Sequence, residues 1–140
     1  MNITTKGRYA LRIMLDLAQQ DPDEIVPLNA IAKRQEVSGK YLEMIMGLLN
    51  KAGFVQSTRG KNGGYRLVRK PEAYTILEIL EQTEGSLAPV ACLQTEENPC
   101  VRADACLTLP LWKQLDELVN NYLSSVTLQD LLQPDRKQSE

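Results

Sequence analysis

Cysteine is the residue type of this chain that most clearly indicates chemistry. The three cysteines, Cys92, Cys100 and Cys106, lie within fifteen residues of a chain of 140, with the spacing Cys-x7-Cys-x5-Cys. Thiolate sulfur is a soft ligand that suits iron–sulfur clusters and zinc. A structural zinc ion takes four protein ligands, and this chain has no histidine to complete such a set. The pattern therefore favours an iron–sulfur cluster, 2Fe–2S or 4Fe–4S, and leaves three free thiols as the simpler alternative.

The stretch around the cysteines does not have the pattern of a buried element. Residues 85–110 contain Pro, Asn and acidic residues, and no cysteine falls on an apolar helical face. We therefore predict an exposed loop that carries a sensor site.

Charge is divided unevenly between the two halves of the chain. Residues 1–70 carry 12 Lys+Arg against 6 Asp+Glu, whereas residues 71–140 carry 4 against 12, within a formal net charge of −2. A basic half beside an acidic half predicts a polyanion-binding face at one end. No run approaches the roughly 18 apolar residues of a membrane span, and the N-terminus has no signal-type apolar stretch, so we expect a cytoplasmic protein without a membrane partner. The absence of histidine and of a phosphate-binding loop argues against an enzyme.

The helices predicted in the first half have the order of a helix-turn-helix. The first, Lys6–Gln20, is apolar except for one narrow polar stripe, so we expect it to lie under other elements. A short helix begins at Pro27, and after a break Ser38 can cap a longer helix that buries one apolar face. The opposite face of that longer helix carries Lys40 and Glu43, as expected of a helix that reads DNA.

A basic hairpin follows directly. Phe54–Arg59 and Tyr65–Arg69 are predicted as strands, and Asn62-Gly63 between them is predicted to take the positive φ angles of a tight turn. The positive charges of this hairpin are Arg59, Lys61, Arg66 and Arg69. A helix-turn-helix with such a hairpin is a winged helix, whose wing suits phosphates or a narrow minor groove.

A long amphipathic helix is predicted after the cysteines. Its apolar stripe comprises Leu111, Leu115, Leu118, Tyr122 and Val126. This stripe is too wide to be left in water, so we expect it to pack both on the first helix and on a second copy of the chain. Short capped helices are predicted at Thr75 and at Thr127, each with an acidic residue three positions later.

The predicted fold class is mainly α with a small β-hairpin wing: a winged helix-turn-helix domain plus a long C-terminal dimerisation helix. We divide the chain into a DNA-binding domain at residues 1–84, a cysteine-bearing sensor loop at 85–110, a dimerisation helix and short C-terminal helix at 111–132, and a flexible tail at 133–140.

The chain resembles the Rrf2 family of bacterial winged-helix transcription regulators, and is most similar to its cysteine-containing, IscR-like members. The resemblance covers residues 1 to about 132. It rests on Tyr9-Ala10-Leu11-Arg12, on Ser38 with Tyr41-Leu42-Glu43, on Arg59-Gly60 with Gly63-Gly64-Tyr65, and on three spaced cysteines before Leu-Trp.

The resemblance implies a homodimer that binds a partly palindromic double-stranded DNA operator. It implies that Ser38, Lys40, Tyr41 and Glu43 lie at the major groove and that Arg59, with Gly60 and Lys61 beside it in the wing, lies at the minor groove. It also implies that the three cysteines hold an iron–sulfur cluster. Cluster-free members respond instead to a metabolite or a partner protein.

The chain departs from the family at the fourth cluster ligand. Some members use a histidine three residues after the last cysteine, where this chain has Leu109, and others use an aspartate in the partner's first helix, where this chain has Arg8. The remaining candidates are Glu96, Glu97, Asp104, Thr108, the partner chain, solvent or a small thiol.

The leading hypothesis is a transcription regulator, expected to be a repressor, whose operator binding responds to iron, redox state or nitric oxide through a cluster on the three cysteines. The first alternative is a DNA-binding repressor that uses the cysteines as a thiol redox switch. The second is an iron–sulfur carrier or assembly partner that does not bind DNA.

Overall fold

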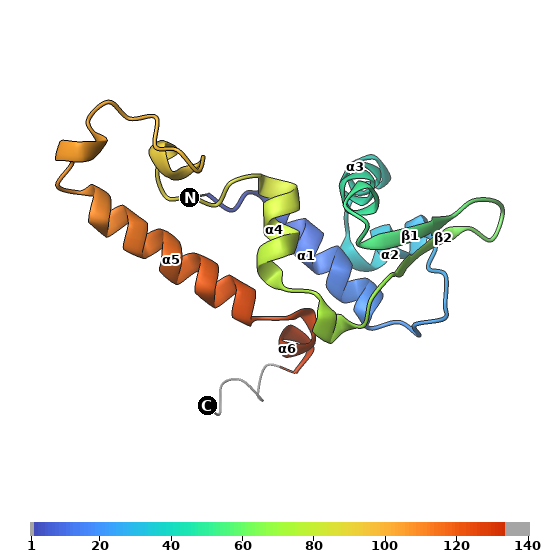
Figure 1. Ribbon diagram of the computed structural model, residues 1–140. Coiled ribbons are helices and arrows are strands. Elements are labelled where there is room, and N and C mark those ends of the chain that lie inside the picture. Colours follow the sequence, from blue (N-terminus) through green and yellow to red (C-terminus); the bar gives the residue numbers. More distant parts are fainter. Residues whose placement is uncertain (1, 134–140) are drawn as a thin grey trace.

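The computed structural model describes residues 2–133, which form a helical body with one projecting hairpin (Figure 1). The α-helices are α1 (Thr5–Ala18), α2 (Leu28–Gln35), α3 (Gly39–Lys51), α4 (Ile76–Glu84), α5 (Leu109–Ser125) and α6 (Leu128–Leu132). The strands are β1 (Val55–Thr58) and β2 (Gly64–Leu67), and short 3-10 helices are η1 (Pro71–Ala73), η2 (Ala91–Leu93) and η3 (Ala103–Ala105). The predicted fold class is confirmed. The tail predicted at 133–140 lies, except for residue 133, outside the described residues.

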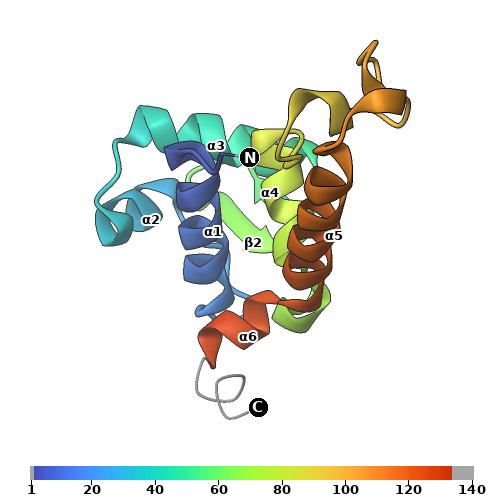
Figure 2. The ribbon, with the colours of Figure 1, turned by 90° about the vertical axis from the view of Figure 1, so that its left-hand side faces the viewer.

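Helix α1 lies at the centre of the core. Its residues Ala10, Ile13 and Met14 are completely buried, and it packs against α2, α3, α4, α6 and β2. The prediction that this helix lies under other elements is confirmed. Figure 2 shows α1 crossing the middle of the body with α3 above it and α6 below.

One buried carboxylate fastens α1 to α2. Asp16 is only 2% exposed, and its two oxygens accept hydrogen bonds from Arg34 Nε at 3.0 Å and Arg34 Nη2 at 2.8 Å. Gln35 Nε2 donates to the same carboxylate at 2.8 Å. The hydrogen bond with Asp16 raises the pKa of Arg34 above its ordinary value, against the opposing effect of burial. A bidentate pair of this kind fixes the orientation of α2 as well as its position.

The hairpin pairs β1 with β2 in antiparallel register, from Val55 opposite Leu67 to Thr58 opposite Gly64. The other edge of β2 is held by Val26, whose N–H and carbonyl exchange hydrogen bonds with Tyr65 at 2.8 and 2.9 Å. A Cβ on Gly64 would collide with the Val26 carbonyl, so glycine is required where the two segments approach most closely.

The turn of the hairpin differs from the prediction. Neither Asn62 nor Gly63 has a positive φ; the left-handed residue is Gly60, with φ of 112°. The Gly63 N–H donates to the Gly60 carbonyl at 3.0 Å, and a Cβ on Gly63 would meet the Thr58 carbonyl. The prediction was wrong because the loop is a wider turn that closes on Gly60, and Gly63 is required by close approach and not by its φ angle.

The two strands are shorter than predicted because the residues at the base of the hairpin have other partners. Tyr74 is completely buried, and its hydroxyl donates to the Phe54 carbonyl at 2.6 Å. The same oxygen accepts hydrogen bonds from the Val68 N–H at 3.0 Å and the Arg69 N–H at 2.9 Å. One side chain thereby gives hydrogen-bond partners to three backbone groups at the base of the hairpin, where the hydrogen bond between the strands is a long one, from the Val68 N–H to the Phe54 carbonyl at 3.4 Å.

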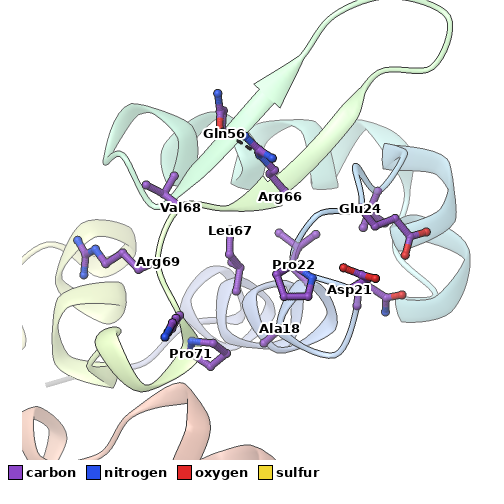
Figure 3. Close-up of a pocket in the computed structure, with 14 residues that line it drawn as sticks. Ala18, Asp21, Pro22, Glu24, Gln56, Arg66, Leu67, Val68, Arg69 and Pro71 are labelled. Atoms are coloured by element: carbon purple, nitrogen blue, oxygen red, sulfur yellow. Dashed lines mark hydrogen bonds between the residues drawn. The ribbon is translucent and has the colours of Figure 1, made fainter.

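A pocket of about 330 Å³ lies between the hairpin and the end of α1 (Figure 3). Ala18, Pro22 and Leu67 lie along its apolar side, and Gln56 and Arg66 stand on the strands above it. Beside this space β2 still packs on α1 and β1 on α3, and the backbone pairing with Val26 holds the outer edge of β2.

Helix α5 packs chiefly against α4, as Figure 2 shows. The expectation was that this helix would pack both on the first helix and on a second copy; within the chain α4 lies between α1 and α5 and supplies most of the contact with α5. Beyond α5, the chain returns to the body: the Ile76 N–H donates to the Val126 carbonyl at 2.9 Å, and Leu128 is completely buried. The caps predicted at Thr75 and Thr127 are both present as reciprocal capping boxes.

Candidate nucleic-acid interface and cysteine segment

The N-terminal end of α3 is exposed and polar. Ser38 caps the helix, its hydroxyl accepting a hydrogen bond from the Tyr41 N–H at 3.2 Å. Lys40 and Glu43 lie in the first turns with exposed side chains, and no ion pair within residues 2–133 engages either of them. The turn before α3 is set by Glu36, whose φ of 54° ends α2 in the left-handed conformation. This arrangement presents the start of α3 as a surface with unengaged donors and acceptors.

Tyr41 has a different environment from its neighbours. It is half-buried, and its ring meets the Tyr9 ring edge to face with centroids 5.7 Å apart. The Arg12 guanidinium lies over the Tyr9 ring, 4.5 Å from the ring centroid. It also donates a hydrogen bond to the Gln35 carbonyl at 2.6 Å. Tyr41 therefore packs α3 against α1, which agrees with its position beside the buried stripe.

The tip of the hairpin presents the two other basic residues singled out from the sequence. Arg59, Gly60 and Lys61 are exposed, and no ion pair holds either cation in the described part of the chain. Figure 1 shows the loop extending away from the body on the same side as α3. The start of α3 and the hairpin tip are thus two separate exposed surfaces, each with at least one basic residue. A helix that enters one groove of DNA with a wing beside it requires this arrangement.

The remaining two hairpin cations are engaged in structural contacts. Arg66 Nε and Nη2 both donate to Gln56 Oε1, at 3.1 and 3.0 Å. Arg69 pairs with Glu78 at 2.8 Å and lies 4.9 Å from the centre of the Tyr74 ring. Burial raises the pKa of Glu78, but the hydrogen bonds from the Thr75 N–H and from Arg69 outweigh it and lower the pKa overall. Counting charges in the sequence could not separate these cations from those at the tip.

The cysteine segment lies at the far end of the molecule from the hairpin (Figure 1). Residues 85–108 contain only η2 and η3 as regular structure, as expected of a loop, and α5 begins at Leu109, inside the range of 85–110 predicted for the loop. All three thiols are free, with Cys100 exposed and Cys92 and Cys106 half-buried. Among the described residues, no three Cys, His, Asp or Glu side chains converge as a metal site. The structure therefore brings the cysteines into one segment without assembling them into a ligand cage.

Two polar details distinguish this segment. A hydrogen bond from the Thr108 side chain, followed by one from its N–H, lowers the pKa of the Cys106 thiol, whose Sγ lies 3.4 Å from Thr108 Oγ1. The Asn98 side chain accepts from the Cys100 N–H at 2.9 Å, while its buried Nδ2 has no partner among the described residues. The first detail favours the thiolate form of Cys106, and the second leaves a hydrogen-bond donor that an acceptor in this region could use.

A residue that the sequence did not single out joins this segment to α1. Glu84 ends α4, and its carboxylate accepts hydrogen bonds from the Thr4 N–H at 2.9 Å and the Gly7 N–H at 2.8 Å. It thus satisfies the exposed N–H groups at the start of α1, where Thr4 makes no side-chain cap. Gly85, at φ of 77°, follows immediately and opens the cysteine segment. A partner 77 residues away in the sequence leaves no local signal that could have identified this contact.

These features define a class of protein. A buried first helix, a capped helix with an unengaged polar face and a hairpin with a basic tip make a winged helix-turn-helix DNA-binding protein. None of the helices in the described residues is long and apolar enough to cross a membrane.

The chain belongs to the Rrf2 family, described as iron-dependent transcriptional regulators, whose model matches residues 3–134. It is 39% identical over 132 residues to the HTH-type transcriptional regulator IscR of Xenorhabdus nematophila, covering 94% of this chain and 79% of the relative. It is also similar to the solved structure of CymR, the global cysteine regulator of B. subtilis, with a TM-score of 0.75, 38% identity and coverage of 94% and 95%. The structure of T. potens IscR has a TM-score of 0.75 at 33% identity, covering 100% of this chain and 92% of that one.

The family membership confirms the resemblance found in the sequence. The chain is a DNA-binding transcription regulator of the Rrf2 and IscR type, and its relatives are regulators and not enzymes. The alternative of a carrier that does not bind DNA is set aside on this ground.

Proposed function

We propose that this chain is a homodimeric regulator whose affinity for its operator depends on an iron–sulfur cluster held by Cys92, Cys100 and Cys106. The observation that carries the proposal is the presence of three free thiols in one segment that is joined through Glu84 to the DNA-binding helices. Residues 1–84 would then bind DNA, 85–110 would sense the signal, and 111–132 would join two copies.

The donor chemistry of the segment fits a cluster. Three cysteines without histidine suit iron better than structural zinc, and the lowered pKa of Cys106 favours the thiolate that a cluster requires. When bound, the cluster would supply a redox- and iron-sensitive crosslink between three points of a segment that has little regular structure. The fourth ligand would come from the acids of the segment, Thr108, the partner chain or a small molecule.

The proposed DNA contacts are Ser38, Lys40, Tyr41 and Glu43 at the major groove, and Arg59, Gly60 and Lys61 at the minor groove. Lys40 and Glu43, exposed in the first turns of α3, would reach base edges, and Glu43 would accept a hydrogen bond from a cytosine amino group. Tyr41 would act through its packing on Tyr9, which positions α3.

The proposed dimer interface is the outer face of α5. Leu111, Leu118 and Tyr122 are 60%, 61% and 67% exposed, so this helix leaves a row of large apolar side chains uncovered in the single chain. Such a face is most simply covered by its symmetric copy. Leu118→Asp should convert a dimer into a monomer in light scattering, whereas Leu131→Asp, on α6, should leave the dimer intact.

Glu84 provides a route from the cysteines to the DNA-binding helices. A change in the conformation of residues 85–108 would shift Gly85 and Glu84, and with them the N-terminal turn of α1, which packs against α3. Glu84→Gln should keep operator binding but reduce the difference in affinity between the two cluster states.

The test is a titration of the anaerobically purified protein with its operator before and after cluster removal. The operator is first selected from a random duplex pool. A coloured protein containing iron and sulfide, with affinity that changes at least severalfold on cluster removal, is expected. Replacement of each cysteine by serine should abolish that change. A colourless protein after anaerobic reconstitution would refute the cluster, and selection of no duplex would refute the choice of DNA contacts.

The second candidate is a thiol switch on the same segment. It is favoured by the exposure of Cys100 and the partial exposure of the other two thiols. Mass spectrometry after mild peroxide would show a reversible disulfide or sulfenic acid, with a matching change in operator affinity, in protein that contains no iron.

A further inference from the structure

The exposed face of α3 has an uncharged centre. Met44 is 47% exposed on this face, the only large apolar side chain in α3 that is exposed, and Gly47 follows one turn later. Neither belongs to the set of polar residues assigned to DNA above. Burial in the core explains neither of them, because the buried residues of α3 are Leu42, Ile45, Met46 and Leu49 on the opposite face.

Glycine at position 47 is unexplained by the fold of the single chain. It lies inside a helix, where glycine is the poorest helix former after proline. A Cβ built on Gly47 would meet no atom within 4 Å, and its φ is not in the left-handed region. Unlike Gly63 and Gly64, which avoid backbone collisions, Gly47 avoids nothing in the described residues. It leaves the outer surface of α3 bare where a ligand could approach the helix backbone.

The surroundings of this centre are polar. Lys40 and Glu43 lie on its N-terminal side, and Asn50 and Lys51 on its C-terminal side, all with exposed side chains. The face of α3 is therefore charged at both ends and apolar in the middle. Solvent would favour a polar side chain at position 44, whereas a partner with one apolar group at its centre would favour methionine.

The major groove of DNA presents one such group. The C5-methyl of thymine is its apolar feature, and the other base edges offer hydrogen-bond donors and acceptors. A methionine side chain is unbranched, polarizable and adaptable, and its thioether is at most a weak acceptor, so it cannot satisfy the polar edges.

We propose that Met44 selects thymine in each half of the operator by packing against its C5-methyl group, and that Gly47 lets α3 lie close enough for this contact. The inference rests on α3 being the helix that enters the major groove. It adds an apolar element to a readout otherwise made by Lys40 and Glu43, and it gives this chain a specificity determinant that the polar residues do not supply.

The experiment uses the full-length protein and its selected operator, in which thymines are replaced one at a time by uracil. This change removes the methyl group and keeps base pairing. At one thymine in each half-site, wild-type affinity should fall about fourfold, the value of one buried methyl-sized group. Met44→Ala should bind the thymine and uracil duplexes with equal affinity. Lys51→Ala, the matched control on the same face, should weaken both duplexes and keep the fourfold ratio.

Gly47→Ala supplies an independent test. Alanine should raise the thermal stability of the protein because it is a better helix former, yet weaken operator binding because the methyl group would occupy the bare surface. Unchanged operator affinity in Gly47→Ala, or wild-type binding that no single uracil affects, would overturn the inference. In the second case the protein would still bind its operator, so failure of this inference is distinct from failure of the DNA-binding role. Equal sensitivity of wild type and Met44→Ala to uracil would show that another residue reads the methyl group.

Discussion

The hydroxyl of Tyr74 should be the single polar atom on which the wing most depends. Tyr74→Phe removes one oxygen and leaves the ring, which packs edge to face on Phe54 with centroids 6.0 Å apart. The lost oxygen donates to the Phe54 carbonyl at 2.6 Å and accepts from the Val68 and Arg69 N–H groups at 3.0 and 2.9 Å.

The size of the loss in stability depends on the hydrogen bonds that these three backbone groups can make without the oxygen. The Val68 N–H and the Phe54 carbonyl retain only their mutual hydrogen bond of 3.4 Å, and the Arg69 N–H loses its partner. Tyr74 is completely buried, so water cannot easily fill the space that the oxygen would leave. A buried backbone group left without a partner costs about 1–3 kcal/mol; since the two N–H groups are only partly buried, we expect the free energy of unfolding to fall by about 2 kcal/mol.

Urea denaturation followed by far-UV circular dichroism measures this change, with protein concentration held fixed because a dimer unfolds in a concentration-dependent way. Tyr9→Phe is the control, since no hydrogen bond from its hydroxyl is found within residues 2–133. Operator affinity should fall in Tyr74→Phe and stay unchanged in the control, because the wing is held at its base. A change in unfolding free energy of less than about 0.5 kcal/mol would refute the reasoning, since it would mean that the three backbone groups find equivalent partners.

Three further perturbations probe other contacts. Gly64→Ala should destabilise the protein by about 2 kcal/mol, because its Cβ meets the rigid Val26 carbonyl, whereas Gly47→Ala should not; thermal melts of the two variants make the comparison. Glu78 has a lowered pKa, so its ionised form stabilises the fold above the pKa of about 4.3 of a free glutamate, and this contribution is lost as pH falls through the lower folded value. The difference in unfolding free energy between wild type and Glu78→Gln should accordingly be present at neutral pH and vanish at pH values below the folded pKa of Glu78. A difference that grows on acidification would contradict the lowered pKa. Asp16→Asn should cost about 2–3 kcal/mol in urea denaturation by leaving a partly exposed guanidinium without its bidentate partner, and a loss near zero would show that solvent replaces the pair.

Local patterns in the sequence were sufficient for most of the secondary structure. The apolar spacing that predicted the first helix and the helix capped by Ser38 depends only on neighbours three and four residues apart, and the caps at Thr75 and Thr127 are contacts within one turn. The predictions of the strand ends and of the hairpin turn were less accurate. Glycine is required at positions 63 and 64 because backbone carbonyl groups from other parts of the chain lie close to them, and not because of their φ angles.

The sequence by itself determined the winged-helix class, the gathering of the three cysteines in one exposed segment and the basic character of the DNA-binding half. These follow from residue types and from contacts between near neighbours along the chain. Only the tertiary structure decided which basic residues are unengaged, since Arg69 is committed to Glu78 and Arg59 is not. It alone placed α5 on α4 and joined Glu84 to the start of α1, because such contacts depend on how distant segments meet after the core around α1 has formed.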